Sequence, residues 1–216
     1  MKREIILWDL NMPQYERKDH FYKKAKAHGK ASRAAYKIEE IQRRFRIIQS
    51  GDRVADLGCA PGGWLQPMAA WVGPTGKVVG IDLEKIRIPL PAHVVCVQMD
   101  ISQCIENPTA LTTFLGGSAH AVVSDMAPHT SGTRFLDQIR AVELAKTAWE
   151  CAQMILLPGG HFVVKIFEGP EVSDFRKVLQ HHFEQVKTID PEASRKGSLE
   201  RYFVCLSLKK DRPPPP

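Results

Sequence analysis

From residue 53 onward the chain alternates short β-type runs with helical stretches, and this alternation restricts its possible folds more than any other feature. Helices are predicted at about 62–72, 107–115, 137–156 and 171–182. Such alternation is typical of an α/β fold in which helices cover both faces of a mostly parallel sheet. Branched and apolar runs predict seven strands, at Arg53–Leu57, Lys77–Asp82, His93–Gln98, His120–Ser124, His161–Phe167, Phe183–Ile189 and Arg201–Leu208.

Two features complete this expected architecture. Only Asp190–Glu200 separates the last two strands, too few residues for a crossover helix, so we expect an antiparallel hairpin at the edge of the sheet. Upstream of the first strand, Ser32 is the predicted N-cap of a further helix. The apolar stripe of that helix is formed by Ala35, Ile38, Ile41 and Phe45.

The composition is that of an ordinary globular protein. Hydrophobic residues make up 44% and charged residues 25% of the 216-residue chain, and no apolar run approaches the roughly 18 residues of a membrane helix. The five cysteines show no CxxC spacing, which argues against a zinc module or a secreted disulfide framework. We therefore expect a cytoplasmic monomer with neither a metal ion nor a membrane partner.

Positive charge is concentrated at the start of the chain. Residues 1–50 hold 13 Lys and Arg against 6 Asp and Glu, whereas the remainder is nearly neutral. Aromatic residues interleave with the basic ones between Arg17 and Lys37, as on a nucleic-acid-binding surface. The alternative is a solvated helix face that binds nothing.

The segment Val54–Trp64 runs from a strand through a glycine-rich turn toward a helix, where open α/β sheets bind ligands. Its glycines are Gly58, Gly62 and Gly63, so the middle glycine of the dinucleotide motif G-x-G-x-x-G is missing. This spacing disfavours a nicotinamide oxidoreductase. It suits a nucleoside without phosphates, such as S-adenosylmethionine.

Acidic residues lie at the ends of the next two predicted strands, where Asp82 ends the second strand and Asp100 follows the third. Asp82 could accept the ribose hydroxyls of a nucleoside, and Asp100 could accept its adenine amino group. The alternative for each is a helix cap or a turn residue. Trp64 lies on the first turn of the helix predicted at about 62–72, which follows the glycine-rich turn. It is equally compatible with core packing and with contact to adenosine.

Several motifs in order resemble the FtsJ/RrmJ-type RNA ribose 2′-O-methyltransferases, from about Arg17 to Leu208. The resemblance implies a Rossmann-like class I methyltransferase with an antiparallel last strand. It also implies a catalytic tetrad of Lys37, Asp125, Lys165 and Glu200, and S-adenosylmethionine contacts at Gly62, Trp64, Asp82, Asp100 and Asp125. The motifs are Ser32–Lys37, Asp56–Trp64, Ser124–Pro128 with Ser131-Gly132, Val164–Phe167, and Ser194-Arg195 with Ser198, Glu200 and Tyr202.

Lys165 lies in the apolar run Phe162–Phe167, although lysine is almost never fully buried unpaired. A structural salt bridge is one interpretation. In the other, Lys165 removes the ribose proton, which requires desolvation and the Lys37 cation to lower its pKa. Asp125 and Glu200 would favour the charged ammonium instead. Whether Lys165 is a neutral base or a charged group that orients the hydroxyl stays open.

The resemblance implies a uridine of large-subunit ribosomal RNA as target, free or in the assembled subunit. Transfer RNA methylation and a non-catalytic RNA-binding or assembly role are the alternatives. We expect residues 1–16 to be an extension of unknown role, 17–50 an RNA-binding helical segment, 51–210 the methyltransferase domain and 211–216 a disordered tail. The expected RNA contacts are Lys18, Lys23, Lys24, Lys26, Lys30 and Arg33, with Arg195 and Lys196 on the opposite rim.

Overall fold

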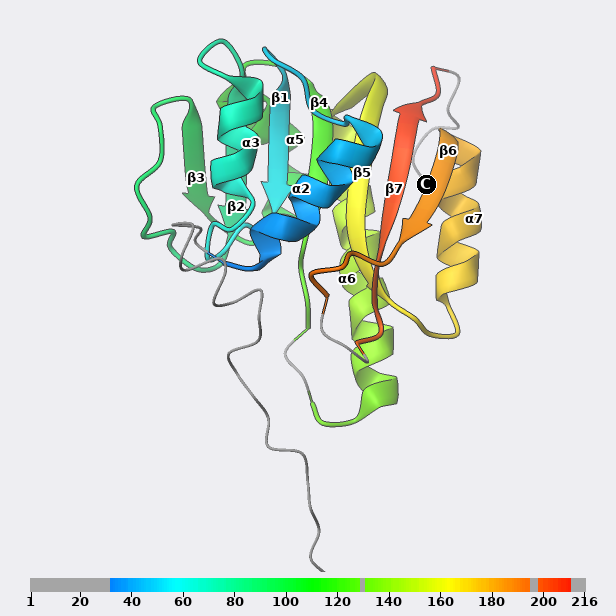
Figure 1. The fold of residues 1–216 in the computed structure, drawn as a ribbon. Helices are drawn as coiled ribbons and strands as arrows, with labels where there is room; N and C mark the ends of the chain where they lie inside the picture. The colour runs from blue at the N-terminus through cyan, green and yellow to red at the C-terminus, as the bar shows by residue number, and fades with distance from the viewer. Residues whose placement is uncertain (1–31, 129–130, 195–197, 211–216) are drawn as a thin grey trace, which may run out of the picture.

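The computed structural model describes residues 32–128, 131–194 and 198–210, and these form one seven-stranded sheet (Figure 1). The strand order is β3-β2-β1-β4-β5-β7-β6. The strands are β1 (Arg53–Leu57), β2 (Lys77–Asp82), β3 (Val94–Gln98), β4 (Ala119–Ser124), β5 (Leu156–Phe167), β6 (Phe183–Ile189) and β7 (Glu200–Leu208).

The pairing directions confirm the predicted fold class. Strands β1 to β5 pair in parallel, and β7 pairs antiparallel with both β5 and β6. The last two strands therefore form the expected hairpin, with β6 at the edge of the sheet and β7 inserted beside β5.

Helices cover both faces of the sheet. In Figure 1, α2 and α3 lie in front of the strands, while α5 and α6 lie behind them. Two hydrophobic clusters correspond to these layers, one beneath α2 and α3 and the other beneath the remaining helices. The helices are α2 (Ala34–Phe45), α3 (Leu65–Val72), α4 (Ile101–Glu106), α5 (Pro108–Leu115), α6 (Arg134–Ile155) and α7 (Val172–His182).

The predicted boundaries were wrong in several places. Helix α3 begins at Leu65 rather than 62, because Gly62 has a φ of 102° and stays in the turn. The short helix α4 was missed because its six residues are too few for the apolar positions Ile101, Cys104 and Ile105 to stand out as a helical stripe. Helix α6 starts at Arg134 rather than 137, and strand β5 starts at Leu156 rather than 161.

Helix α2 packs its predicted stripe on the sheet, but its start differs by one residue. The N-cap position is Arg33, whereas the Ser32 hydroxyl accepts a hydrogen bond from the Ala34 amide at 3.1 Å. Glu40 is also buried, and its carboxylate accepts from the Glu192 amide at 2.9 Å. This bond ties α2 to the loop that precedes β7.

The strand register places the polar groups of several strands on one face. Asp56 in β1 is level with Gly80 in β2 and Val123 in β4, and side chains two residues apart on a strand share a face. Asp82 and Asp125 therefore lie on the same face as Asp56, one step nearer the carboxyl edge. Lys165, Tyr202 and Glu200 share this face by their pairing in β5 and β7.

Several sequence predictions concern residues 1–31, 195–197 and 211–216, which lie outside the described residues. These include the N-terminal extension, the proline tail and most of the predicted RNA contacts, namely Lys18, Lys23, Lys24, Lys26, Lys30, Arg195 and Lys196. Among the residues that are described, no helix is long and apolar enough to cross a membrane.

Candidate active site

The four residues of the predicted tetrad meet at the carboxyl edge of the sheet, where they form two ion pairs. Lys37 Nζ lies 2.6 Å from Glu200 Oε1, and Lys165 Nζ lies 2.9 Å from Asp125 Oδ1. Lys165 also donates to the Asp125 carbonyl oxygen at 2.5 Å. Both lysines are buried, with 5% and 8% of their surface exposed. The site therefore holds two desolvated cations, each paired with a carboxylate.

Tyr202 joins the two ion pairs, and its place in the site was not predicted. Its hydroxyl donates to Asp125 Oδ1 at 2.5 Å and accepts from Lys37 Nζ at 3.2 Å. Tyr202 follows Glu200 by two residues, so β7 presents both side chains on one face. The spacing of two residues between Glu200 and Tyr202 on a predicted strand was the sequence signal that could have identified Tyr202 as a site residue. Ser194 also contributes, because its hydroxyl donates to Glu200 Oε1 at 2.9 Å.

The electrostatics of the site favour an ionised Asp125 and a neutral Tyr202. Burial opposes ionisation of Asp125, but Lys165, Lys37 and the Tyr202 hydroxyl outweigh it and lower the pKa of the carboxyl. Burial, followed by the charges of Asp125 and Glu200, raises the pKa of the Tyr202 phenol well above its ordinary value. Tyr202 therefore acts as a neutral hydrogen-bond relay.

The glycines of the turn after β1 are required for packing. A Cβ on Gly58 would overlap the Met126 side chain, and Gly58 has a φ of 79°. A Cβ on Gly62 would lie 2.6 Å from Ile88, and one on Gly63 would overlap the Ser32 hydroxyl. The turn is therefore enclosed by the residue before the N-cap of α2, by the chain directly after β4 and by the chain after β2. The part these glycines play in binding a cofactor stays a prediction.

Asp82 ends β2 at the same edge, and its carboxylate organises the backbone around it. One oxygen accepts from the Ala60 amide and the other from the Glu84 amide, both at 2.8 Å. Each carboxylate oxygen retains a further lone pair, so Asp82 can hold the turn and accept from a ligand together.

Asp100 and Trp64 have structural roles, and their predicted cofactor contacts stay predictions. Asp100 is the N-cap of α4, where Oδ1 accepts from both the amide and the hydroxyl of Ser102. These bonds lower the pKa of the Asp100 carboxyl. Trp64 is 2% exposed, donates its indole N–H to the Ala34 carbonyl at 2.8 Å and packs against Tyr202. It therefore joins α2 to the start of α3.

Asp56 is a buried acid that the sequence predictions did not assign to the site. It is 1% exposed, and its Oδ2 atom has no hydrogen-bond partner. Burial raises the pKa of its carboxyl well above the ordinary value, and the charges of Asp125, Cys96 and Asp82 raise it further. An unpaired acid of this kind fits a ligand that brings a positive charge to this edge of the sheet.

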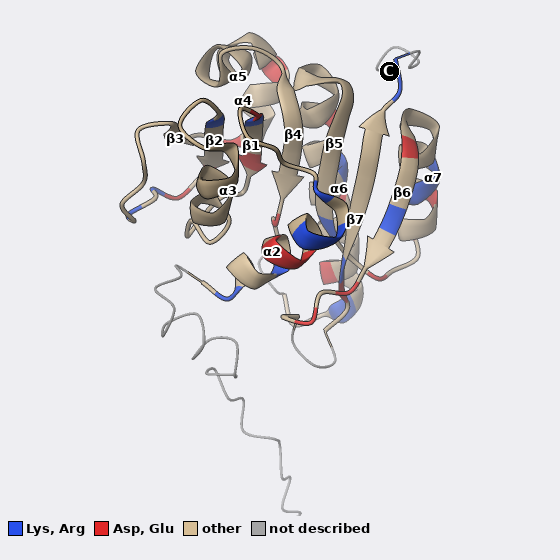
Figure 2. Ribbon diagram, turned by 45° about the horizontal axis from the view of Figure 1, so that its top comes forward, with Lys and Arg blue, Asp and Glu red and all other residues tan. Residues whose placement is uncertain are grey.

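Helix α2 brings Lys37 to this edge and carries Arg33, Arg43 and Arg44 as well; Figure 2 shows charged segments along the helix beside the strand ends. Arg43 and Arg44 are exposed, whereas Arg33 is half-buried. The predicted contact of Arg33 with RNA stays a prediction.

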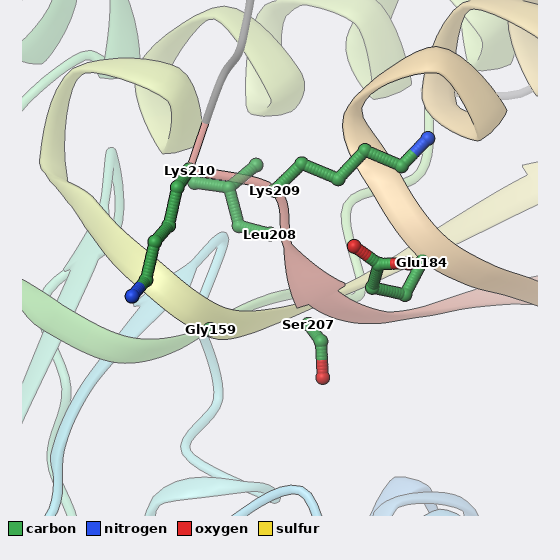
Figure 3. Close-up of a pocket in the computed structure, with 6 residues that line it drawn as sticks. All are labelled: Gly159, Glu184, Ser207, Leu208, Lys209 and Lys210. Carbon is green, nitrogen blue, oxygen red and sulfur yellow. The ribbon is translucent and has the colours of Figure 1, made fainter.

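A separate hollow lies at the other end of β7, far along the strands from the tetrad (Figure 3). It has a volume of about 460 Å³ and is open to solvent. None of the predicted site residues in the described part of the chain lines it. Its lining is Gly159, Glu184, Ser207, Leu208, Lys209 and Lys210.

The strand order, the antiparallel β7 and the polar residues at the carboxyl edge together define a methyltransferase of the Rossmann-like class. A crystal structure of a ribosomal RNA methyltransferase, putative, from Plasmodium falciparum superposes with a TM-score of 0.71 and 25% identity, over 82% of this chain and 97% of that one. The MycE methyltransferase superposes with a TM-score of 0.55 at 14% identity, over 92% of this chain and 52% of that one, which supports the fold alone.

The chain belongs to the FtsJ-like methyltransferase family, whose model matches residues 31–208. Ribosomal RNA large subunit methyltransferase E of Nitratidesulfovibrio vulgaris (strain Miyazaki F) is 42% identical, over 90% of this chain and 96% of that protein. The protein of the same name from Syntrophobacter fumaroxidans is 43% identical, over 91% of this chain and 98% of that protein. The family resemblance noted in the sequence is therefore confirmed, and the chain is a methyltransferase.

Proposed function

We propose that this enzyme transfers the methyl group of S-adenosylmethionine to a ribose 2′-hydroxyl of large-subunit ribosomal RNA, most specifically to a uridine. The observation that carries the proposal is the pairing of Lys165 with Asp125 beside the glycine turn. Relatives that cover most of the chain are named ribosomal RNA large subunit methyltransferase E. Their name supports ribosomal RNA over transfer RNA as the substrate.

The residues at the carboxyl edge fit S-adenosylmethionine. We assign its adenosine to Asp82, Asp100, Trp64 and the turn that contains Gly58, Gly62 and Gly63. The methionine part carries an ammonium and a sulfonium, and the unpaired oxygen of Asp56 together with Asp125 supplies negative charge for these cations. When bound, the cofactor supplies an electrophilic methyl group on sulfur.

The tetrad would prepare the nucleophile. The ion pair with Asp125 favours the charged form of Lys165. An ammonium has three N–H donors, and two of those on Lys165 are given to the carboxylate and the carbonyl of Asp125. The third can donate to the ribose oxygen and stabilise the negative charge that develops there as the hydroxyl proton passes to solvent water and the oxygen bonds to the methyl carbon. We propose that Lys165 orients the hydroxyl as a cation rather than accepting the proton as a neutral amine.

Lys37 and Glu200 would help to hold Asp125, and through it Lys165, in place. Their ion pair contacts Tyr202, whose hydroxyl in turn donates to Asp125. Positioning of this kind matters, because holding two reactants in line can lower a barrier by roughly 7–11 kcal/mol. The chain would thus act chiefly by alignment and electrostatic stabilisation.

We further propose that the enzyme works as a monomer in the cytoplasm and binds RNA through the basic residues of its N-terminal segment, 17–50. The net charge of +6 and its concentration in the first 50 residues support an RNA partner. Whether the substrate is free ribosomal RNA or the assembled large subunit is a question for experiment.

Transfer of tritium from labelled S-adenosylmethionine tests the substrate class. Free ribosomal RNA, large ribosomal subunits and transfer RNA are offered side by side, and we expect incorporation into ribosomal RNA or subunits. Label confined to transfer RNA would contradict the proposed target. Incorporation into none of the three, by a protein that binds RNA, would favour the non-catalytic alternative.

A further inference from the structure

Asp56 is the buried ionisable group at the carboxyl edge that the tetrad leaves unused. Its side chain is level with Gly80 on one side and Val123 on the other, so it lies beneath the last residues of β2 and β4. Asp82, the last residue of β2, and Asp125, the first residue after β4, lie one step further along on the same face. Three carboxyl groups from three adjacent strands are thus gathered in one row.

The members of this row differ in how their charge is compensated. Asp125 is paired with Lys165 and accepts from Tyr202, and Asp82 accepts from two backbone amides. Asp56 has neither an ion pair nor, at Oδ2, a hydrogen bond among the residues that the structure describes. A buried carboxylate left in this state is costly, so burial favours the protonated form of the carboxyl group.

The ionisable groups that interact with Asp56 come from the neighbouring strand ends and from the glycine turn. They are Asp82 of β2, Cys96 of β3, Asp125 after β4, and the Cys59 thiol of the glycine turn. The first three raise the pKa of the Asp56 carboxyl, in the same direction as its burial, and no cation is among them. A cation that bound next to Asp56 would shift the equilibrium from the protonated to the ionised carboxyl, because a nearby opposite charge favours the ionised acid.

We propose that Asp56 is a proton-coupled counter-ion for the cofactor, protonated in the free enzyme and ionised when S-adenosylmethionine binds. Its carboxyl O–H bond breaks on binding, and the proton passes to the solvent buffer. The inference rests on the proposed function, since it requires that this edge bind the cofactor. In this role Asp56 is a binding residue that distinguishes S-adenosylmethionine from S-adenosylhomocysteine, the product that remains after methyl transfer.

The distinction follows from charge. S-adenosylmethionine carries a sulfonium cation, whereas S-adenosylhomocysteine has a neutral thioether at the same position. The product therefore provides one positive charge less to hold Asp56 in its ionised form. Proton release should be larger for the cofactor than for the product, and the preference of the enzyme for the cofactor should increase with pH.

Calorimetry in two buffers of different ionisation enthalpy, phosphate and Tris, measures the protons released by each nucleoside. For the unaltered protein at neutral pH, we expect up to about one proton for S-adenosylmethionine and a clearly smaller number for S-adenosylhomocysteine. Because this comparison uses the unaltered protein, it does not depend on whether a variant folds.

The variant Asp56→Asn should abolish the difference in proton release. It should weaken S-adenosylmethionine binding by about ten-fold or more while changing S-adenosylhomocysteine binding by less than about three-fold, since the lost contact is to a charged group. Asp174→Asn is the matched control, because Asp174 is an exposed acid on α7 paired with Lys177. This control should bind both nucleosides and release protons as the unaltered protein does.

Two unfavourable results have different meanings. If both nucleosides bind and release equal numbers of protons, the coupling through Asp56 is wrong and the proposed function is unaffected. If the folded protein binds neither nucleoside, the proposed function itself fails, and this inference fails with it.

Discussion

Asp125 holds the Lys165 ammonium at two points, with its carboxylate at 2.9 Å and its own backbone carbonyl at 2.5 Å. One residue directly after β4 thus fixes the position of a lysine on the neighbouring strand β5. A surface lysine would lose rotamer freedom without gain in such a contact. Here the ion pair is buried, and it directs the remaining N–H donor of Lys165.

Replacement of Lys165 should therefore separate catalysis from cofactor binding. We expect Lys165→Ala to abolish methyl transfer while leaving the affinity for S-adenosylmethionine within a few-fold, because the adenosine contacts come from other strands. Tritium transfer and calorimetry measure the two effects. Lys187→Ala, which removes an exposed lysine from β6, is the control and should be fully active. Turnover close to normal in Lys165→Ala would remove Lys165 from the mechanism.

Tyr202→Phe tests the link between the two ion pairs. The variant keeps the ring that packs on Trp64 and removes the hydroxyl that joins Lys37 to Asp125. Loss of a buried hydrogen bond to a charged group should lower the free energy of unfolding by about 1.5–3 kcal/mol. We also expect a lower kcat with an unchanged KM for the cofactor. Denaturant unfolding and steady-state kinetics check both, and unchanged values in both would show that the relay is unimportant.

Asp82→Ala should weaken cofactor binding. A charge-assisted acceptor typically contributes about 1.5–3 kcal/mol, so we expect a loss of affinity of roughly ten- to a hundred-fold. Asp82 also accepts from the Ala60 amide, so the comparison includes Asp82→Asn, whose side-chain carbonyl can keep one of these backbone bonds. Calorimetry with each folded variant gives the affinities. Normal binding by both would make Asp82 a structural residue only.

The raised pKa of the Asp56 carboxyl predicts how stability depends on pH. A group whose pKa is raised by folding retains its proton in the native state after the unfolded chain has released it. Its contribution to stability is therefore full below the unfolded carboxyl pKa of about 3.9 and is lost as pH rises toward the native value. Asp56→Asn should flatten this decline and raise stability at neutral pH. Urea titrations from pH 5 to pH 8 measure it, and an unchanged slope would mean that Asp56 is ionised.

The basic N-terminal segment yields a prediction about RNA. Changing Lys23, Lys24 and Lys26 to Glu should raise the KM for RNA and flatten the salt dependence of binding, since each phosphate contact contributes roughly 0.7–0.9 log units per log unit of salt. Cofactor affinity should remain normal.

The matched control applies the same charge change elsewhere, at Lys177, Lys187 and Lys210, which are exposed on α7, on β6 and in the segment after β7. This control should bind RNA nearly as well as the unaltered protein. If both triple variants lose affinity equally, total charge rather than the N-terminal segment determines binding.

The sheet could be predicted from the sequence because each strand contains a short run with branched or aromatic residues. Phe162–Phe167 and Phe183–Ile189 were recognisable in this way. The connection Asp190–Glu200 is too short for a crossover helix, and this indicated that β6 and β7 pair antiparallel. Helix α4 was missed because six residues are too short a run for helical periodicity to be recognised, although its apolar residues are spaced as on one helix face.

The composition of the site was accessible from its motifs, but its internal pairing was not. Lys37 and Glu200 are 163 positions apart in the chain, and their contact depends on how α2 crosses the sheet. The link through Tyr202 and the unpaired state of Asp56 likewise depend on register and burial. These are properties of the assembled sheet, and a single sequence does not encode them in any local pattern.

The position on the nucleotide at which the methyl group arrives is the most direct test of ribose 2′-O-methylation by this enzyme. Large ribosomal subunits are labelled with tritiated S-adenosylmethionine and the unaltered enzyme, and the recovered RNA is hydrolysed in alkali. A ribose 2′-O-methyl group removes the hydroxyl that alkali needs, so the adjacent phosphodiester survives. We predict tritium in alkali-resistant dinucleotides that begin with uridine, and none with Lys165→Ala. Label recovered in mononucleotides would place the methyl group on a base and contradict the account.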